Sequence, residues 1–156
     1  MSQPQGQTLR FRRVPIGARG QGHWLNLAEY GLSDPQAPTI FMIHGAAGSW
    51  HNWRLQMERF SKDYRVLAPD LRGHGISPWP GVCHIQDFVD DLEALLDVEV
   101  PGSFTLFSHS FGGGLAAYLY ERRPQQIQRM ALLNTGGHIP QGLTYRGQMD
   151  GTPDVV

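Results

Sequence analysis

The sequence predicts an α/β protein with a mostly parallel sheet and helices on both faces. Apolar residues alternate along the chain between a strand-like and a helical period, as expected of alternating strands and helices. Some apolar runs are continuous, which is typical of strands buried on both faces. The chain has 156 residues, 40% of them apolar and 17% charged, enough for one globular domain with a buried core. We expect that single domain, spanning residues 1–156, to have its ordered core at about residues 8–134.

The N-terminal part predicts a hairpin followed by a central strand. Residues 8–12 and 24–30 alternate apolar with polar side chains and flank the glycine-rich residues 17–22. This pattern predicts an antiparallel hairpin at one edge of the sheet. Residues 39–43 (Thr-Ile-Phe-Met-Ile) are continuously apolar, so we expect a strand buried on both faces.

A helix is expected next, because Trp53, Met57 and Phe60 recur at spacings of four and three residues. A strand is predicted at residues 64–68. A loop rich in glycine and proline should follow at residues 69–81.

The clearest helix is predicted at residues 85–96, where apolar side chains line one face and acidic side chains the other. A buried strand at residues 104–107 leads into a helix that ends before Pro124. Residues 128–134 form the last apolar strand, and the rest of the chain, with no usable period, is expected to be loop.

Composition excludes several classes of function. The net charge is -1 and the arginines are scattered along the chain, so neither nucleic acid nor a membrane is expected as a partner. Cys83 is the only cysteine, which rules out an internal disulfide. No apolar run resembles a signal peptide or a membrane span, so we expect a cytoplasmic protein. The histidine spacing predicts no metal site, and His23, His51 and His84 are expected to be solvated or capping residues.

The strongest chemical signal is the segment Ser108-His109-Ser110-Phe111-Gly112, between a predicted strand and a predicted helix. A serine in a sharp strand-to-helix turn projects its hydroxyl from the sheet edge, and small neighbours let the turn close. The usual pattern is G-x-S-x-G, and Ser108 replaces the first glycine here. Without other signals, the segment would also suit a turn with no chemistry.

Two further motifs follow the strands that precede this turn. His44-Gly45-Ala46-Ala47-Gly48 comes directly after residues 39–43, and Asp70-Leu71-Arg72-Gly73-His74-Gly75-Ile76-Ser77 comes after residues 64–68. Each motif lies at the carboxyl end of a predicted strand, where open α/β sheets bind their ligands.

Together the three motifs resemble the α/β-hydrolase family, in the branch with HGxxG and DxRGHGxS. The resemblance covers about residues 8–134 and implies an incomplete α/β-hydrolase fold. It implies Ser110 as the nucleophile, with the backbone N–H groups of Ala46 and Phe111 forming the oxyanion hole. The remaining motif positions are implied to be structural: His44, Gly45, Gly48, Asp70, Arg72, Gly73, His74, Gly75 and Gly112.

The sequence does not match either of two common nucleotide-binding motifs. Residues 45–49 follow a strand as a phosphate loop would, but no Gly-Lys-Ser/Thr comes after them. Residues 73–78 lack the third glycine of a dinucleotide fingerprint, and Pro78 falls where a helix should begin. The sequence therefore predicts no metal and no cofactor.

The family order is serine, then an acid, then a histidine. His138 follows Ser110 but precedes Asp150 and Asp154, and Asn134 stands where some relatives carry the acid. We therefore expect this chain to be the front part of a longer domain, with residues 135–156 a loop or the beginning of a lid. The isolated chain is expected to be inactive.

Three functions stay open from the sequence. The first is a serine hydrolase acting on an ester, lactone or similar carbonyl substrate. The second is a non-catalytic binding module that keeps the hydrolase pocket, and the third is a cofactor-free lyase or acyltransferase. A small molecule is the expected partner in each case, and the apolar strand at 128–134 predicts self-association through an exposed sheet edge.

Overall fold

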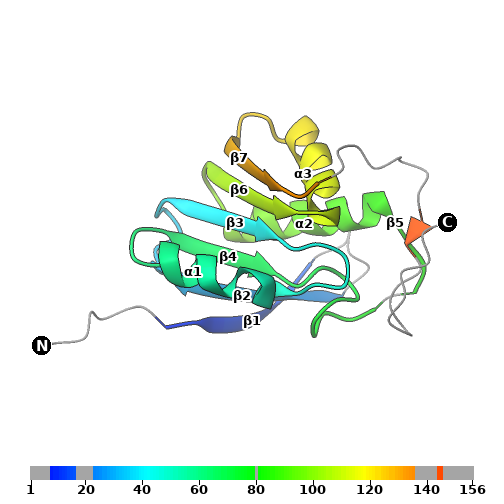
Figure 1. The fold of residues 1–156 in the computed structure, drawn as a ribbon, viewed down its shortest axis with the longest axis horizontal. Helices are drawn as coiled ribbons and strands as arrows, with labels where there is room; N and C mark the ends of the chain where they lie inside the picture. Colours follow the sequence, from blue (N-terminus) through cyan, green and yellow to red (C-terminus); the bar gives the residue numbers. More distant parts are fainter. Residues whose placement is uncertain (1–7, 17–22, 80, 136–143, 146–156) are drawn as a thin grey trace, which may run out of the picture.

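The fold is known from a computed structural model that describes residues 8–16, 23–79, 81–135 and 144–145. Its centre is a six-stranded sheet in the order β1-β2-β4-β3-β6-β7 (Figure 1). The strands of this sheet are β1 (Arg10–Pro15), β2 (Trp24–Gly31), β3 (Thr39–Ile43), β4 (Arg65–Pro69), β6 (Phe104–His109) and β7 (Ile127–Leu133). β5 (Cys83–His84) pairs separately with β8 (Thr144–Tyr145).

The sheet is antiparallel at one edge and parallel elsewhere. β1 and β2 form the predicted hairpin, and β2 pairs antiparallel with β4. β4, β3, β6 and β7 then run parallel to one another. The carboxyl ends of these four strands therefore meet at one edge of the sheet, where the three sequence motifs begin.

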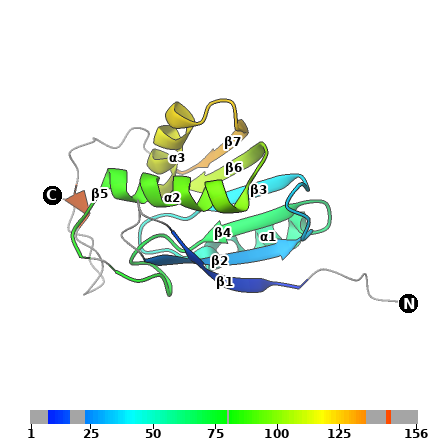
Figure 2. The same ribbon diagram turned by 180° about the vertical axis from the view of Figure 1, so that it is seen from behind.

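Helices cover both faces of the sheet, as predicted. α1 (Arg54–Phe60), preceded by the 3-10 turn Trp50–Trp53, lies on the face seen in Figure 1. α2 (Ile85–Glu99) and α3 (Phe111–Arg122) lie on the opposite face, turned toward the viewer in Figure 2. Each face has its own apolar core, and the larger one lies under α2 and α3.

The structure corrects the expected position of the first strand. β1 begins at Arg10 and continues to Pro15, beyond the predicted residues 8–12. Val14 is the β1 side chain buried in the core, whereas Phe11 is 50% exposed and contacts Trp50 at the sheet surface. The hairpin was correctly predicted, but β1 does not alternate as expected, because all its residues except Val14 are exposed.

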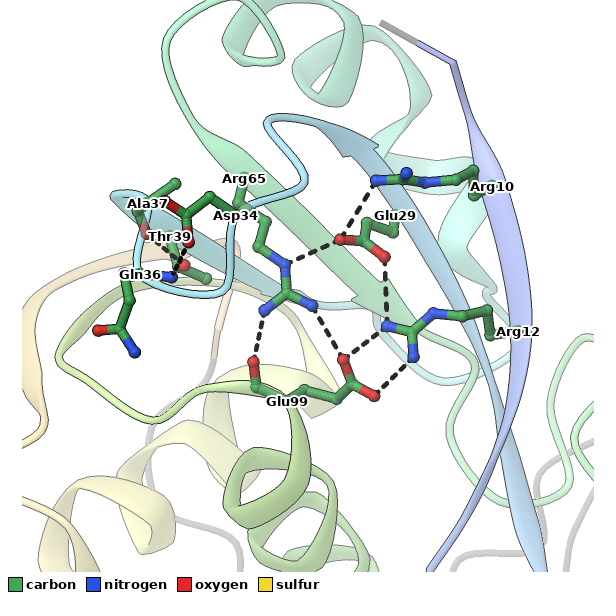
Figure 3. A network of polar contacts seen from close by, with 9 residues as sticks. All are labelled: Arg10, Arg12, Glu29, Asp34, Gln36, Ala37, Thr39, Arg65 and Glu99. Atoms are coloured by element: carbon green, nitrogen blue, oxygen red, sulfur yellow. Dashed lines mark hydrogen bonds and ion pairs between the residues drawn. The ribbon is translucent and has the colours of Figure 1, made fainter. Parts of the chain in front are cut away.

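A network of charged side chains at the amino end of β4 was not predicted (Figure 3). Arg65 is 3% exposed, and its guanidinium donates to Glu29 Oε1 at 2.8 Å and to Glu99 Oε2 at 2.9 Å. Arg12 adds a two-pronged contact to Glu99 at 2.9 and 2.6 Å and reaches Glu29 at 3.2 Å. The network ties β1, β2, β4 and the end of α2 together, so these arginines are not scattered in space.

We propose that the outer edge of β7 pairs with a second copy of the chain. No described strand lies beyond β7, and Leu132 and Leu133 are 50% and 41% exposed there. An apolar strand edge of this kind favours association. Light scattering of the 156-residue chain should give a mass above 17.5 kDa, falling toward that value in Leu132→Lys. Val98→Lys, at an exposed position of α2, should leave the mass unchanged, and a stable wild-type monomer at high concentration would refute the pairing.

Candidate active site

Ser110 occupies a strained turn between β6 and α3. Its backbone dihedrals are φ 50° and ψ -118°, a positive φ that non-glycine residues rarely adopt. The Ser110 N–H donates to the Leu133 carbonyl at 3.0 Å, and the Ser110 carbonyl accepts from the Gly113 N–H at 2.8 Å. The predicted strand-to-helix turn is thus confirmed, and both ends of the turn are held by hydrogen bonds.

Two glycines bring the turn after β3 against Ser110. A Cβ placed on Gly45 would lie 3.1 Å from Ser110 Cβ and 3.0 Å from His109 Nδ1. A Cβ on Gly112 would lie 2.6 Å from the His44 carbonyl oxygen, closer than real side chains come. Only glycine lets α3 approach β3 this closely, so the two motifs are adjacent in space.

His44 is buried within the turn after β3. Its Nδ1–H donates to the Gly45 carbonyl at 2.7 Å, and its Nε2 accepts from the Leu71 N–H at 3.0 Å. Burial lowers the pKa of His44 to about 3, so the imidazole is neutral near pH 7. With both ring nitrogens engaged, His44 links two turns and has no free nitrogen to act as a base.

Asp70 is the second link between the turns and is 1% exposed. Its carboxylate accepts from the Trp50 N–H at 2.8 Å, the Asn26 side chain at 2.9 Å and the Ile76 N–H at 3.2 Å. Gly75, at φ 53°, leaves room for it, because a Cβ there would lie 2.1 Å from Asp70 Oδ2. One carboxylate thus orders the turns after both β3 and β4.

Replacing Asp70 by alanine should lower the free energy of unfolding by about 2–3 kcal/mol, because it leaves buried N–H groups without acceptors. Urea denaturation followed by tryptophan fluorescence measures the loss. Asp34→Ala, at an exposed position that accepts one backbone N–H, is the matched control and should change stability by less than about 0.5 kcal/mol. Equal effects of the two substitutions would contradict the role given to Asp70.

Arg72 points to α2 and forms a buried ion pair. It contacts both carboxylate oxygens of Asp91, at 2.6 and 2.5 Å. His23 Nε2 lies 3.2 Å from the same carboxylate, and the His23 side chain is only 12% exposed. The expectation that His23 is solvated was therefore wrong, since the hairpin carries it onto Asp91. His84 does cap α2, as expected, and His51 is exposed.

His74 and the remaining glycines shape the turn after β4. His74 Nδ1 lies 2.9 Å from the Arg72 carbonyl oxygen, and burial lowers its pKa. Gly73 has φ 71° and packs against the Trp79 ring. In the neighbouring turn after β3, the Gly48 N–H donates to the Gly45 carbonyl at 3.1 Å. These contacts place His74 within the turn rather than at Ser110.

Several cavities open at this edge of the sheet. One of about 410 Å³ lies between the turns and is lined by Ala47, Gly48, Ser49, Asn52, Gly73, His74 and Gly75. Another, of about 200 Å³, is lined by Asn52, Trp53, Gln56, His109 and Leu133. Trp50 belongs to the apolar core under α1, and Trp79 and Phe111 pack against the core on the other face. These three aromatic residues serve mainly as core.

The implied oxyanion residues lie near Ser110 in the chain or in space. Phe111 is the first residue of α3, directly after Ser110, and Ala46 is exposed in the turn that packs on Ser110. Among the described residues, no side chain forms a hydrogen bond with the Ser110 hydroxyl, although the His109 imidazole lies on the same turn. Glu121 precedes His138 in the order acid then histidine, but it lies about 15 Å of helix rise along α3 from Phe111. His138 lies outside the described residues.

The described residues contain no group of three or more His, Cys, Asp or Glu side chains placed to hold a metal ion. None of the helices in that part of the chain has the length and apolar character to cross a membrane.

Two curated bacterial enzymes are similar in sequence to this chain. The 2-hydroxymuconate semialdehyde hydrolase of Pseudomonas sp. (strain CF600) is 35% identical over 117 residues, which cover 72% of this chain and 40% of that enzyme. Lipase LipV of Mycobacterium tuberculosis is 36% identical over 110 residues, which cover 70% of this chain and 41% of the lipase. The chain thus spans about two fifths of the length of these relatives.

Structure and family comparisons agree with this similarity. An epoxide hydrolase from metagenomes of hot environments superimposes with a TM-score of 0.73 at 28% identity, covering 82% of this chain and 43% of that one. A sequence model for the alpha/beta hydrolase fold matches residues 38–151. The match includes all three motifs, and the chain belongs to the alpha/beta hydrolase fold family.

Proposed function

We propose that the chain carries the nucleophile and the oxyanion hole of a serine hydrolase that cleaves an ester, lactone or similar carbonyl substrate. The observation that carries the proposal is the strained backbone of Ser110, at φ 50° between β6 and α3. Such strain costs about 1–3 kcal/mol and persists at sites where a side chain must be presented in one orientation.

The chemistry assigned to Ser110 is attack of its hydroxyl oxygen on the substrate carbonyl. Charge then develops on the carbonyl oxygen and needs hydrogen-bond donors fixed in advance. We assign this role to the backbone N–H groups of Ala46 and Phe111, each expected about 3 Å from the oxyanion. The helix dipole of α3, which is positive at its N-terminus, stabilises the same negative charge.

The nucleophile also needs a base, and that base an orienting acid. We assign both to residues of the longer protein, because His44 and His74 are engaged within turns and His138 precedes the late acids Asp150 and Asp154 instead of following them. The names of similar proteins cover a semialdehyde hydrolase, a lipase and epoxide hydrolases. All these names describe hydrolases, which supports hydrolysis as the class of reaction. They differ in the bond that is cleaved, so the bond must be identified by experiment.

The test uses the protein extended beyond Val156 and a panel of p-nitrophenyl esters, lactones and epoxides. Hydrolysis of at least one ester or lactone is expected, with Ser110→Ala lowering kcat by about 10⁶ through loss of the nucleophile. Mass spectrometry should locate a fluorophosphonate adduct on Ser110.

Ser108→Ala is the matched control, since Ser108 lies two residues before Ser110 and is fully buried. Its hydroxyl has no hydrogen-bond partner among the described residues, so its loss should leave kcat within a few-fold. Absence of both hydrolysis and labelling in the longer protein would favour the binding module. Turnover of lyase or acyltransferase substrates alone would favour the third function.

A further inference from the structure

Ala47 adopts a backbone conformation that an alanine side chain disfavours. Its φ is 61°, in the left-handed region where Cβ crowds the following carbonyl oxygen. The Gly48 N–H donates to the Gly45 carbonyl at 3.1 Å, so Ala47 is the third residue of a four-residue β-turn. Ala46, the second residue, has no positive φ, and this combination is that of a type II turn, whose third position normally holds glycine. An alanine at this position therefore keeps the turn under strain.

Packing of the apolar core does not explain the strain. Ala47 is exposed, and it lines the cavity of about 410 Å³ between the turns after β3 and β4. The turn is instead clamped on both sides of Ala47. A Cβ on Gly45 would lie 3.1 Å from Ser110 Cβ, and a Cβ on Gly48 would lie 2.9 Å from Asn52 Oδ1. The neighbours thus hold the turn in place, and Ala47 gains no burial in return.

Positive φ values gather around Ser110. Among the described residues, three residues other than glycine have a positive φ, namely Ala47, Ser110 and Asn134. Ala47 shares its turn with Gly45, which packs against Ser110. Asn134 directly follows Leu133, whose carbonyl accepts from the Ser110 N–H at 3.0 Å. Strained backbone that gathers at one place without a gain in packing is typical of functional sites.

The turn leaves two backbone donors free. Neither the Ala46 N–H nor the Ala47 N–H donates a hydrogen bond to a described residue, whereas the Gly48 N–H closes the turn. The peptide that joins the second and third residues of a β-turn is flipped between type I and type II turns, because φ of the third residue changes sign. In a type I turn the Ala46 carbonyl oxygen would therefore point to the side where the Ala47 N–H points now. The left-handed conformation of Ala47 decides which of these two groups faces each side of the turn.

We propose that Ala47 is a positioning residue for the oxyanion hole, and that its left-handed backbone keeps the Ala46 carbonyl oxygen turned away from the reacting carbonyl. This inference rests on the proposed function, in which the Ala46 N–H donates to the oxyanion. A carbonyl dipole flipped toward the developing negative charge would oppose the stabilisation that the N–H groups supply. The strained conformation of Ala47 is retained because it orients this peptide.

The inference predicts different effects for two substitutions of similar size in the protein extended beyond Val156. Ala47→Val brings in a β-branched side chain that strongly disfavours a positive φ. It should lower kcat about 10²-fold, the effect of losing one oxyanion donor, and leave KM within about twofold. Ala47→Asn is the conservative variant, because asparagine adopts a positive φ more readily than alanine, and it should retain most of kcat. Steady-state kinetics on an ester that the wild type hydrolyses measures both.

The strain itself can be measured without catalysis. In the 156-residue chain, Ala47→Gly should raise the midpoint of thermal unfolding by about 2–4 °C, since glycine adopts this φ freely. Ala37→Val in the extended protein is the matched control for Ala47→Val. Ala37 has no positive φ and lies in the turn before β3, at the opposite end of that strand, so kcat should not change.

Three results would overturn the positioning role while the wild type remains an active hydrolase. They are full kcat in Ala47→Val, a loss in Ala47→Asn as large as that in Ala47→Val, and an unchanged or lower unfolding midpoint in Ala47→Gly. The second comparison uses Ala47→Asn against the wild type, so it stays informative where Ala47→Val does not fold. An inactive wild type in the extended protein would instead reject the proposed function, and the role of Ala47 with it.

Discussion

The 156-residue chain alone is expected to show no measurable esterase turnover and to resist fluorophosphonate labelling at Ser110. A serine hydroxyl is a weak nucleophile near neutral pH and needs a base within hydrogen-bond reach. Removing that base from a triad enzyme lowers turnover by about 10⁶. The oxyanion hole and substrate binding alone retain about 10³–10⁴ over the uncatalysed rate. Burst labelling followed by mass spectrometry measures the reactivity of Ser110 directly.

The longer protein is the positive control for this comparison, and its Ser110→Ala variant is the negative control. Rapid and stoichiometric labelling of Ser110 in the short chain would contradict the expectation. A base would then be present in this chain or in a second copy, and loss of labelling in His138→Ala would identify His138 as that base.

The second large effect is a loss of folding stability, expected when the buried charge network of Figure 3 is disrupted. Arg65→Met should lower the free energy of unfolding by about 3–5 kcal/mol, because it removes the buried guanidinium that pairs with the buried carboxylates of both Glu29 and Glu99. Arg54→Met removes an arginine from an exposed pair with Glu58 at 3.5 Å and should cost less than about 1 kcal/mol. Urea denaturation of both variants gives the comparison, and equal losses would show that the network is not stabilising.

The same network predicts how stability depends on pH. Burial alone would raise the pKa of the Glu99 carboxyl, but hydrogen bonds and charge from Arg12 and Arg65 outweigh burial and lower it. A lowered pKa in the folded state means that Glu99 stabilises the fold above its usual pKa, and that this contribution is lost as the pH falls below about 4.5. Arg65→Met should therefore lose less stability on acidification than the wild type.

Most of the fold follows from local patterns in the sequence. Continuous apolar runs and a period near 3.6 predicted β3, β6 and α2, since these signals depend on a few neighbouring residues. Sheet order depends on distant pairing, and so does the charge network. Arg12 and Glu99 are 87 residues apart in the chain, and only the tertiary fold, which places the end of α2 within reach of Arg12, brings them together.

At the candidate site, too, local sequence signals could be predicted and contacts between distant segments could not. Ser110, His44 and Asp70 were found because each belongs to a short motif at the end of a strand. The contact of His23 with Asp91 and the hydrogen bond of the Asn26 side chain to Asp70 carry no such motif. They depend on side-chain packing between segments, which the alternation of apolar and polar residues does not encode.

The distance between the charge network and the nucleophile turn makes the two ends of the sheet thermodynamically independent. Thr39 of β3 is in register with both Arg65 and Phe104, and Ser110 follows Phe104 by six residues, about 20 Å of extended strand. Substitutions this far apart usually combine additively within about 0.3–0.5 kcal/mol. A library that reshapes the cavities beside Ser110 can therefore be built on a background stabilised at the Arg65 end, with neither set of changes altering the effect of the other.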